Sequence, residues 1–259
     1  RDRSPSRGLG DVYKRQDDMT AEEKANAFTS ILPGGENHNY FKRKLDKVAS
    51  VLNNLKGADG KLIPVIFRPF HEFDGNWFWW GAAYCTPDQY KQAWQFLVTY
   101  LRDTKGVHNV LYAYSPDNSY TTSSAYLVRY PGDAFVDVLG MDNYGDFTGS
   151  TSGVTRANSK LAMLSTLAKD KVKISALTET GYRVTATTSP ISGFFSTNMY
   201  NALTGGDISV AYVMFWNNDA SGYYVPPAGQ TNTQDFKDFT TKSKSVLQQN
   251  IPSLYTITQ

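Results

Sequence analysis

The chain has 259 residues, 41% of them hydrophobic, which is enough to form one large core. Its formal net charge of +2 gives no electrostatic reason to expect a nucleic-acid partner or an anionic membrane surface. A single cysteine, Cys85, excludes an internal disulfide, and no apolar run reaches the roughly 18 residues of a membrane-spanning helix.

Residues 1–16 differ from the rest of the chain. They are basic, contain few apolar side chains and show no hydrophobic period. We expect a non-native or disordered segment here, resembling a translated adapter joined to a truncated gene, and we exclude it from fold reasoning. On this interpretation the native start and any export signal lie upstream.

Helical patterns recur from residue 17 onward. Thr20 and Glu23 form a capping-box pattern that opens a short helix to about residue 31. Apolar residues at helical spacing predict a second helix over 41–55. Thr86 precedes a proline and a capping-box glutamine, and it opens a helix that ends near residue 106. Further helices are predicted at 122–130, about 161–167, 191–204 and 236–247.

Five apolar runs between these helices predict strands. They lie at residues 62–67, 110–114, 135–141, 172–177 and 210–215. Strands that alternate with helices indicate a parallel sheet. None of the five is followed by a glycine-rich phosphate loop, so the sequence favours a (β/α)8 barrel over a nucleotide-binding fold. A complete barrel needs about three more strands. We therefore predict that residues 17–259 form a partial barrel domain, with the first strands missing.

Each predicted strand ends in an abrupt change from apolar to polar or aromatic residues. In a barrel, the carboxyl ends of the strands carry the chemistry. The residues at these ends are, in chain order, Arg68, Phe70, His71 and Glu72; Ser115 to Asn118; Asp142, Asn143 and Tyr144; Thr178, Glu179 and Thr180; and Trp216 to Asp219. Five such changes in succession indicate one shared polar cleft.

Two of these strand ends carry a glutamate, Glu72 and Glu179. Two carboxylates across a barrel mouth suit glycoside hydrolysis, which needs one protonated and one ionised group. Aromatic neighbours of Glu72 would desolvate it and keep it an acid. Glu179 lies between two threonines, with Arg68 a possible neighbour, and these would keep it ionised. Spacing alone is equally compatible with two surface glutamates at loop starts.

Aromatic residues favour a sugar site. Trp77, Trp79, Trp80, Tyr144 and Trp216 offer flat faces on which pyranose rings can stack. Amides and carboxylates at the strand ends, including Asn217, can bond sugar hydroxyls. Residues 77–80 are four consecutive aromatics and cannot all face one cleft, so we expect one or two to contact sugar and the rest to pack beneath the loop.

Four segments resemble glycoside hydrolase family 26. RPFHEFDGNWFWWG at 68–81 resembles its acid/base segment, and LTETG at 177–181 resembles its nucleophile strand. VDVLGMDNY at 136–144 and MFWNND at 214–219 are similar to two further strands. The resemblance is collinear and covers the chain from about residue 30 to its end.

This resemblance implies a retaining endo-β-1,4-mannanase. Glu72 would be the general acid/base and Glu179 the nucleophile, with carboxyls about 5 to 5.5 Å apart. Residues implied or assigned to substrate contacts are His71, Trp77, Asp142, Tyr144, Trp216, Arg68 and Asn217. We expect no metal, no cofactor and no nucleic-acid partner. The polysaccharide substrate would be mannan, galactomannan or glucomannan, and the enzyme would be a monomer that is secreted or held at the cell surface or periplasm.

Three alternatives remain open at this point. The same two glutamates would serve hydrolysis of β-1,3-xylan or mixed-linkage β-glucan, with Asn217–Gly229 a candidate selectivity loop. A truncated barrel could bind glycan without cleaving it. A metal hydrolase is the third alternative, but the three histidines His38, His71 and His108 show no paired ligand spacing on a helix.

Overall fold

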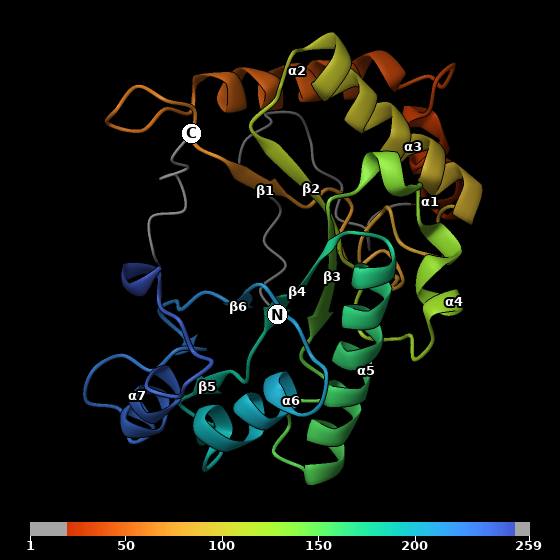
Figure 1. Cartoon of the computed structure of the whole chain (residues 1–259). Helices are drawn as coiled ribbons and strands as arrows, with labels where there is room; N and C mark the ends of the chain where they lie inside the picture. Colours follow the sequence, from red (N-terminus) through yellow and green to blue (C-terminus); the bar gives the residue numbers. More distant parts are fainter. Residues whose placement is uncertain (1–19, 252–259) are drawn as a thin grey trace. The chain divides into compact units, whose positions relative to one another are not determined.

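A computed structural model describes residues 20–251 (Figure 1). These residues divide into two compact units. Unit 1 contains the described residues up to Tyr112 together with Arg129–Phe135. Unit 2 contains Ala113–Val128 and the described chain from Val136 onward. The segment 1–16, which we expect to be non-native or disordered, lies outside the described residues.

Helices α1, α2 and α3 belong to unit 1. Helix α1 (Ala21–Ala27) leads through a 3-10 turn (Thr29–Ile31) to α2 (His38–Asn54). Helix α3 (Pro87–Thr99) continues into a π-helical turn (Tyr100–Thr104). Both predicted capping boxes are present: the Glu23 amide donates to Thr20 Oγ1 and the Gln89 amide to Thr86 Oγ1. These caps satisfy amides that the helix cannot bond internally, which is why both helices start where the sequence predicts.

Strand β1 (Val65–Phe67) pairs in parallel with the first three residues of β2 (Val110–Tyr114) in unit 1. The predicted strand 62–67 is therefore shorter than expected. Leu62 instead forms an isolated antiparallel bridge with Lys56.

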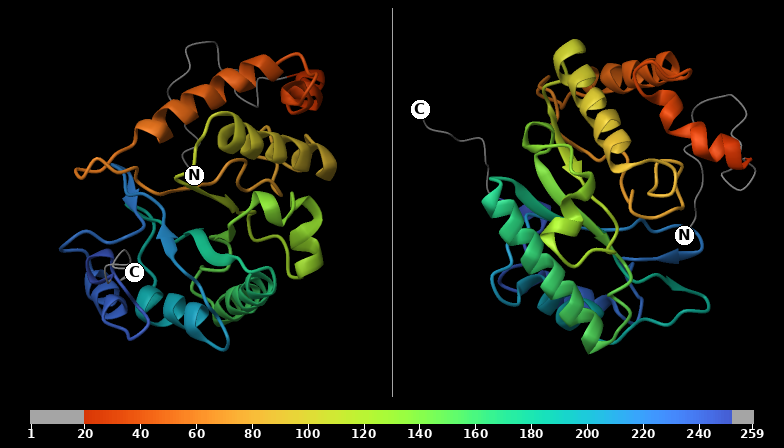
Figure 2. Two further views of the ribbon diagram at one scale, coloured as in Figure 1. Left: turned by 45° about the horizontal axis from the view of Figure 1, so that its top comes forward. Right: turned by 90° about the vertical axis from the view of Figure 1, so that its right-hand side faces the viewer.

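Unit 2 contains the other parallel pairings, in which the last two residues of β2 pair with β3 (Val138–Asn143), β3 pairs with β4 (Ile174–Thr180), and β4 with β6 (Val213–Phe215). Helix α5 (Thr151–Asp170) packs on β3 and β4 (Figure 2). Gly140 lets these strands approach closely, because a Cβ there would lie 2.6 Å from the Thr178 side chain.

The remaining elements of unit 2 are short. Helix α4 (Ser123–Tyr126) runs into a 3-10 turn, and the predicted helix at 191–204 is a π-helical turn (Phe194–Met199) followed by α6 (Tyr200–Thr204). Helix α7 (Thr233–Thr240) ends well before residue 247. Strands β5 (Val184–Thr185) and β7 (Gly222–Tyr223) form a small antiparallel ribbon that the sequence patterns did not predict.

The strand order confirms the predicted fold class. Parallel neighbours follow one another in chain order, β1-β2-β3-β4-β6, without the reversal of a doubly wound sheet. This is the arrangement of a partial (β/α)8 barrel. Among residues 20–251, no helix combines the length and the apolar character that a membrane span requires.

Candidate active site

The loop after β1 in unit 1 carries Glu72 on an unusual backbone. Phe70 and Glu72 both have φ of 50°, in the left-handed region. A non-glycine residue pays roughly 1–2 kcal/mol for this conformation, so the surroundings must enforce it. Three successive carbonyls are bonded: Tyr90 Oη donates to Phe70 O (3.1 Å), Trp80 Nε1 to His71 O (2.8 Å) and the Gly75 amide to Glu72 O (3.2 Å).

The Glu72 carboxylate contacts an indole of the same loop. Trp77 Nε1 donates to Glu72 Oε2 at 2.5 Å, and the glutamate is only 4% exposed. Gly75 makes this contact possible, because a Cβ at that position would lie 2.2 Å from the Trp77 ring. The ring therefore lies directly against the glycine backbone, with its N–H directed at the carboxylate.

The other aromatics of this run have different partners. Trp79 packs beside Phe28 (centroids 5.9 Å apart) and against Phe70 (6.3 Å). Phe78 stacks on Trp80 with centroids 4.4 Å apart and planes 12° from parallel. Within this run, Trp77 bonds the carboxylate, Trp80 bonds the loop backbone, and Trp79 packs against other aromatic rings of unit 1.

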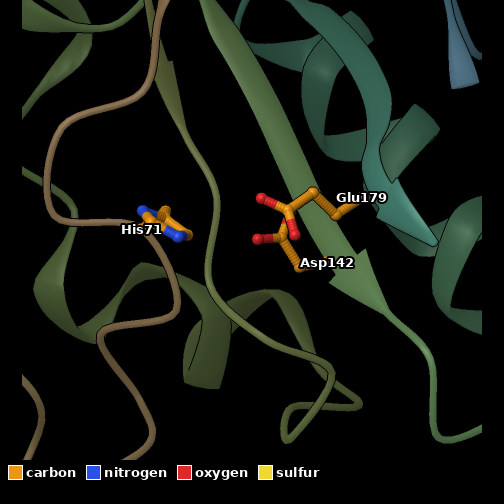
Figure 3. A group of neighbouring side chains, drawn as sticks. All are labelled: His71, Asp142 and Glu179. Atoms are coloured by element: carbon orange, nitrogen blue, oxygen red, sulfur yellow. The ribbon is translucent and has the colours of Figure 1, made fainter. Parts of the chain in front are cut away.

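In unit 2, a β-bulge places Asp142 beside Glu179. Met141 pairs with Leu177, but Asp142 pairs with Glu179, so β4 carries one residue more than β3 at this point. The pairing of β4 with β6 shows the same extra residue, because Leu177 pairs with Val213 and Thr180 with Phe215. A bulge re-aims side chains that would otherwise alternate between faces. As a result, carboxylate oxygens of Asp142 and Glu179 lie within 4.8 Å of one another (Figure 3).

Hydroxyl groups donate to both carboxylates. Thr178 Oγ1 donates to Asp142 Oδ1 at 2.6 Å, and Tyr144 Oη donates to Glu179 Oε2 at 2.9 Å. Asp142 is fully buried and Glu179 is 4% exposed. Burial raises the pKa of Tyr144 far above its usual value, as do the Glu179 charge and hydrogen bond. The phenol therefore stays protonated and remains a donor to Glu179 at any working pH.

A buried ionic network holds the loop that follows β3. Lys160 of α5 donates to Asp146 Oδ2 (2.9 Å) and to Asn118 O (2.7 Å). Asp146 also accepts from Asn143 Nδ2 (3.0 Å) and Arg156 Nε (2.8 Å). Burial alone would raise the pKa of the Asp146 carboxyl, but these three donors together lower it. The hydrogen bond to Asp146 therefore fixes the side chain of Asn143, which lies between Asp142 and Tyr144 in the chain.

The segment after β6 is held by a second set of bonds. Asn218 Oδ1 accepts from the amides of Tyr224 (2.8 Å) and Val225 (3.1 Å). Arg183 donates to both oxygens of Asp219 at 2.6 Å. Hydrogen bonds from Ser221, and then Arg183, lower the pKa of Asp219 to about 2.

Tyr224 links this segment to the Glu179 site. Its ring meets Tyr144 edge-on with centroids 5.9 Å apart. Gly181, with φ of 135°, allows the close approach, since a Cβ there would lie 2.6 Å from Tyr224 Cδ1. Tyr224 lies in the candidate selectivity loop Asn217–Gly229, but the sequence analysis did not single it out, because it belongs to none of the motif segments.

A family model described as "Glycosyl hydrolase family 26" matches residues 13–213. The chain belongs to this family. The resemblance noted in the sequence is thereby confirmed.

Two solved structures and a curated protein are among those similar to this chain over most of its length. The structure of GH26C from Muricauda sp. MAR_2010_75 is 51% identical, with a TM-score of 0.89 over 92% of this chain and 64% of that one. A Cellulomonas fimi endo-beta-1,4-mannanase structure is 38% identical, with a TM-score of 0.83 over 87% of this chain and 51% of that one. The mannan endo-1,4-beta-mannosidase of Bifidobacterium adolescentis is 38% identical over 234 residues, 85% of this chain.

This chain spans less than two thirds of each of those relatives, and only 23% of the Bifidobacterium protein. Family membership therefore establishes the fold class of this chain.

The candidate residues of this family 26 chain fall into two groups. Unit 1 holds Arg68, His71, Glu72 and Trp77, and unit 2 holds Asp142, Tyr144, Glu179, Trp216 and Asn217. Within unit 2, Asp142, Tyr144 and Glu179 come together through the contacts given above, while Trp216, 39% exposed, donates its backbone amide to Thr180 O at 3.1 Å. The separation of Glu72 from Glu179, and the proximity of Arg68 to Glu179, stay predictions because they join the two units.

Proposed function

We propose that this protein is a retaining, endo-acting glycoside hydrolase that cleaves β-1,4-mannan, including galactomannan and glucomannan. The observation that carries the proposal is a buried glutamate at each of two strand ends, each bonded by an aromatic donor: Trp77 to Glu72 and Tyr144 to Glu179. Relatives named as mannan endo-1,4-beta-mannosidases support the choice of substrate.

The reaction proceeds by double displacement. The Glu179 carboxylate attacks the anomeric carbon while Glu72 gives its proton to the departing glycosidic oxygen, which leaves a covalent glycosyl-enzyme. Glu72 then takes a proton from water, which attacks the same carbon and releases Glu179 with overall retention. This route needs the two carboxyls about 5 to 5.5 Å apart.

Tyr144 bonds the proposed nucleophile, Glu179, and Asp142 lies beside it. The Tyr144 hydroxyl, which stays protonated, orients one Glu179 oxygen for the attack. Asp142 contributes a second buried carboxylate beside it, held by Thr178. The hydrogen bond from Tyr144 suits a carboxylate in nucleophilic use, and we propose no metal and no cofactor.

The remaining candidates form the sugar-binding surface. Trp77 and Trp216 offer indole faces for stacking on pyranose rings, and Tyr144 lines the subsite at Glu179. His71, Arg68 and Asn217 offer hydrogen bonds to sugar hydroxyls. The exposed face of Trp216 supports its place in this set.

Two substitutions test the assignment of the glutamates. Glu179→Ala should abolish release of reducing sugar from mannan while mannan still retards the protein in an affinity gel. Glu72→Ala should be rescued in part on aryl glycosides with good leaving groups, because the departure of these groups needs no proton. Glu36→Ala, on an exposed surface, is the control. Near-normal turnover by Glu179→Ala would overturn the assignment.

The anomeric outcome and the substrate need separate measurements. Proton NMR of the first product should show the β anomer before mutarotation, whereas an initial α anomer would exclude double displacement. Parallel assays on mannan, β-1,3-xylan and lichenan should give release from mannan alone. Release of reducing sugar from xylan or lichenan instead would show that mannan is not the substrate. Binding of a glycan without release of sugar would indicate a glycan-binding role.

Export and a monomeric state belong to the same proposal. Mannan polymers are too large to cross a membrane, so the enzyme must meet them outside the cytoplasm. Cell fractionation of the native source should find the protein in the medium, envelope or periplasm, and light scattering should give the mass of one chain. A cytoplasmic pool or a dimer mass would correct these points.

A further inference from the structure

The backbone beneath Glu72 is held by two aromatic donors that have no place in the reaction described above. Tyr90 bonds the Phe70 carbonyl at 3.1 Å, and Trp80 bonds the His71 carbonyl at 2.8 Å. These two carbonyls belong to the peptide groups that lie between the two positive-φ residues, Phe70 and Glu72. A peptide plane rotated at this point would carry the Glu72 side chain with it.

Both donors are themselves held in place. Tyr90 is fully buried in the first turn of α3, where the Tyr90 amide bonds Thr86 O at 3.0 Å. Trp80 is fixed by its stack with Phe78 and by edge-on packing with Trp79, at 5.4 Å between centroids. A rigid donor on a buried carbonyl fixes the direction of that carbonyl, because hydrogen bonds weaken steeply away from linearity.

We infer that Trp80 and Tyr90 are positioning residues that impose the left-handed backbone on Phe70 and Glu72 and so aim the Glu72 carboxyl as proton donor. Trp77 holds the carboxyl end of Glu72, while Trp80 and Tyr90 hold its backbone end. The inference rests on the proposed function, since it assumes that Glu72 is the general acid.

Two substitutions remove the donors, and each has a matched control. Trp80→Phe removes the indole N–H, and Tyr90→Phe removes only the hydroxyl. Trp94→Phe is the matched control for the first, because Trp94 is also in unit 1, fully buried, and donates to Phe135 O at 2.9 Å. Tyr126→Phe is the control for the second, because the buried Tyr126 hydroxyl donates to Gly140 O at 3.0 Å.

The deciding measurement is the dependence of kcat/KM on the leaving group, because kcat/KM reports the first displacement, in which Glu72 is the acid, and not the second, in which it is the base. A misplaced proton donor slows cleavage of mannopentaose but spares a 2,4-dinitrophenyl β-mannobioside, whose leaving group needs no proton. We expect Trp80→Phe and Tyr90→Phe to lower kcat/KM on mannopentaose about tenfold, with less than a twofold change in kcat/KM on the dinitrophenyl substrate. Both controls should lower the two rates by equal factors, in proportion to any loss of folded protein.

Glu72→Gln is measured beside these variants, so that the positioning role of Trp80 and Tyr90 can be tested separately from the role of Glu72 as the acid. If Glu72→Gln shows the leaving-group dependence and Trp80→Phe and Tyr90→Phe behave like their controls, the positioning role is wrong and the proposed function stands. If Glu72→Gln shows no such dependence, Glu72 is not the acid, and both fail. Tyr90→Phe keeps the test decisive should Trp80→Phe fail to fold.

Discussion

Lys160 lies on α5 with its side chain 9% exposed, and its ammonium bonds Asp146 Oδ2 and the carbonyl of Asn118. Replacing it by methionine keeps an unbranched side chain of similar length but removes the charge and all its donors. The Asp146 side chain, 6% exposed, then loses one of its two cations.

The loss of stability in Lys160→Met depends on the partners that Asp146 keeps. Removing one partner of a buried ion pair typically costs 3–5 kcal/mol, because the other charge stays buried. Here Arg156 Nε at 2.8 Å and Asn143 Nδ2 at 3.0 Å still bond the carboxylate, and Arg156 is 53% exposed. We therefore expect Lys160→Met to lower the free energy of unfolding by about 3 kcal/mol, the low end of that range.

Urea unfolding followed by far-ultraviolet circular dichroism measures this loss. With a urea dependence of about 2–3 kcal/mol per molar, the midpoint should fall by about 1 M. Lys169→Met is the matched control on the exposed side of the same helix and should stay within about 0.5 kcal/mol of the unsubstituted protein. Equal midpoints for the two variants would refute the stabilising role of the network.

The network also predicts a pH dependence with a definite sign. The folded-state pKa of Asp146 lies below its usual value, so its contribution to stability is complete above about pH 4. It is lost as pH falls through the folded-state pKa. The stability difference between Lys160→Met and the unsubstituted protein should therefore shrink below pH 4, and a constant difference down to pH 2 would contradict this account.

Three further predictions concern single side chains. Gly75→Ala should push the Trp77 ring out of place, because the new Cβ would lie 2.2 Å from it; a red-shifted tryptophan emission would report this, and an unchanged spectrum with full activity would contradict it. Tyr144→Phe removes the hydroxyl from Glu179 and should lower kcat about tenfold to a hundredfold with a smaller change in KM, whereas a raised KM with an unchanged kcat would indicate a binding role. Burial raises the pKa of the Cys85 thiol, so at pH 8 a disulfide reagent should modify the native protein far more slowly than the urea-unfolded protein, and equal rates would show the thiol to be accessible.

Local sequence signals predicted the start of two helices and the position of one strand. Thr20 and Thr86 cap α1 and α3 as expected, and β2 matches the predicted 110–114, because these elements are specified by neighbours in the chain. Helix α5 begins at Thr151, ten residues before the apolar positions that indicated it. Its first turns lack an apolar period, and the Ser150 cap that starts them is not followed by a capping-box residue.

Long-range contacts explain what the sequence could not predict. The ribbon of β5 and β7 joins two-residue strands that are far apart in the chain, so no periodicity marks it. Tyr224 reaches Tyr144 only because Asn218 and Arg183 shape the segment around it. Strand-end position and motif predict Glu72 and Glu179 as the candidate pair, whereas the donors that hold the Glu72 backbone depend on tertiary packing.

The bulge in β4 determines which face of the sheet the Glu179 carboxyl occupies. Side chains on a strand alternate between two faces, so one extra residue changes which face Glu179 occupies, and no intermediate position exists. Deleting one residue at Thr178 would turn the carboxyl from its present neighbours, while leaving the apolar pattern upstream intact. Transplanting this site into another parallel sheet would accordingly require a central strand one residue longer than both neighbours, and copying the side chains alone would not reproduce it.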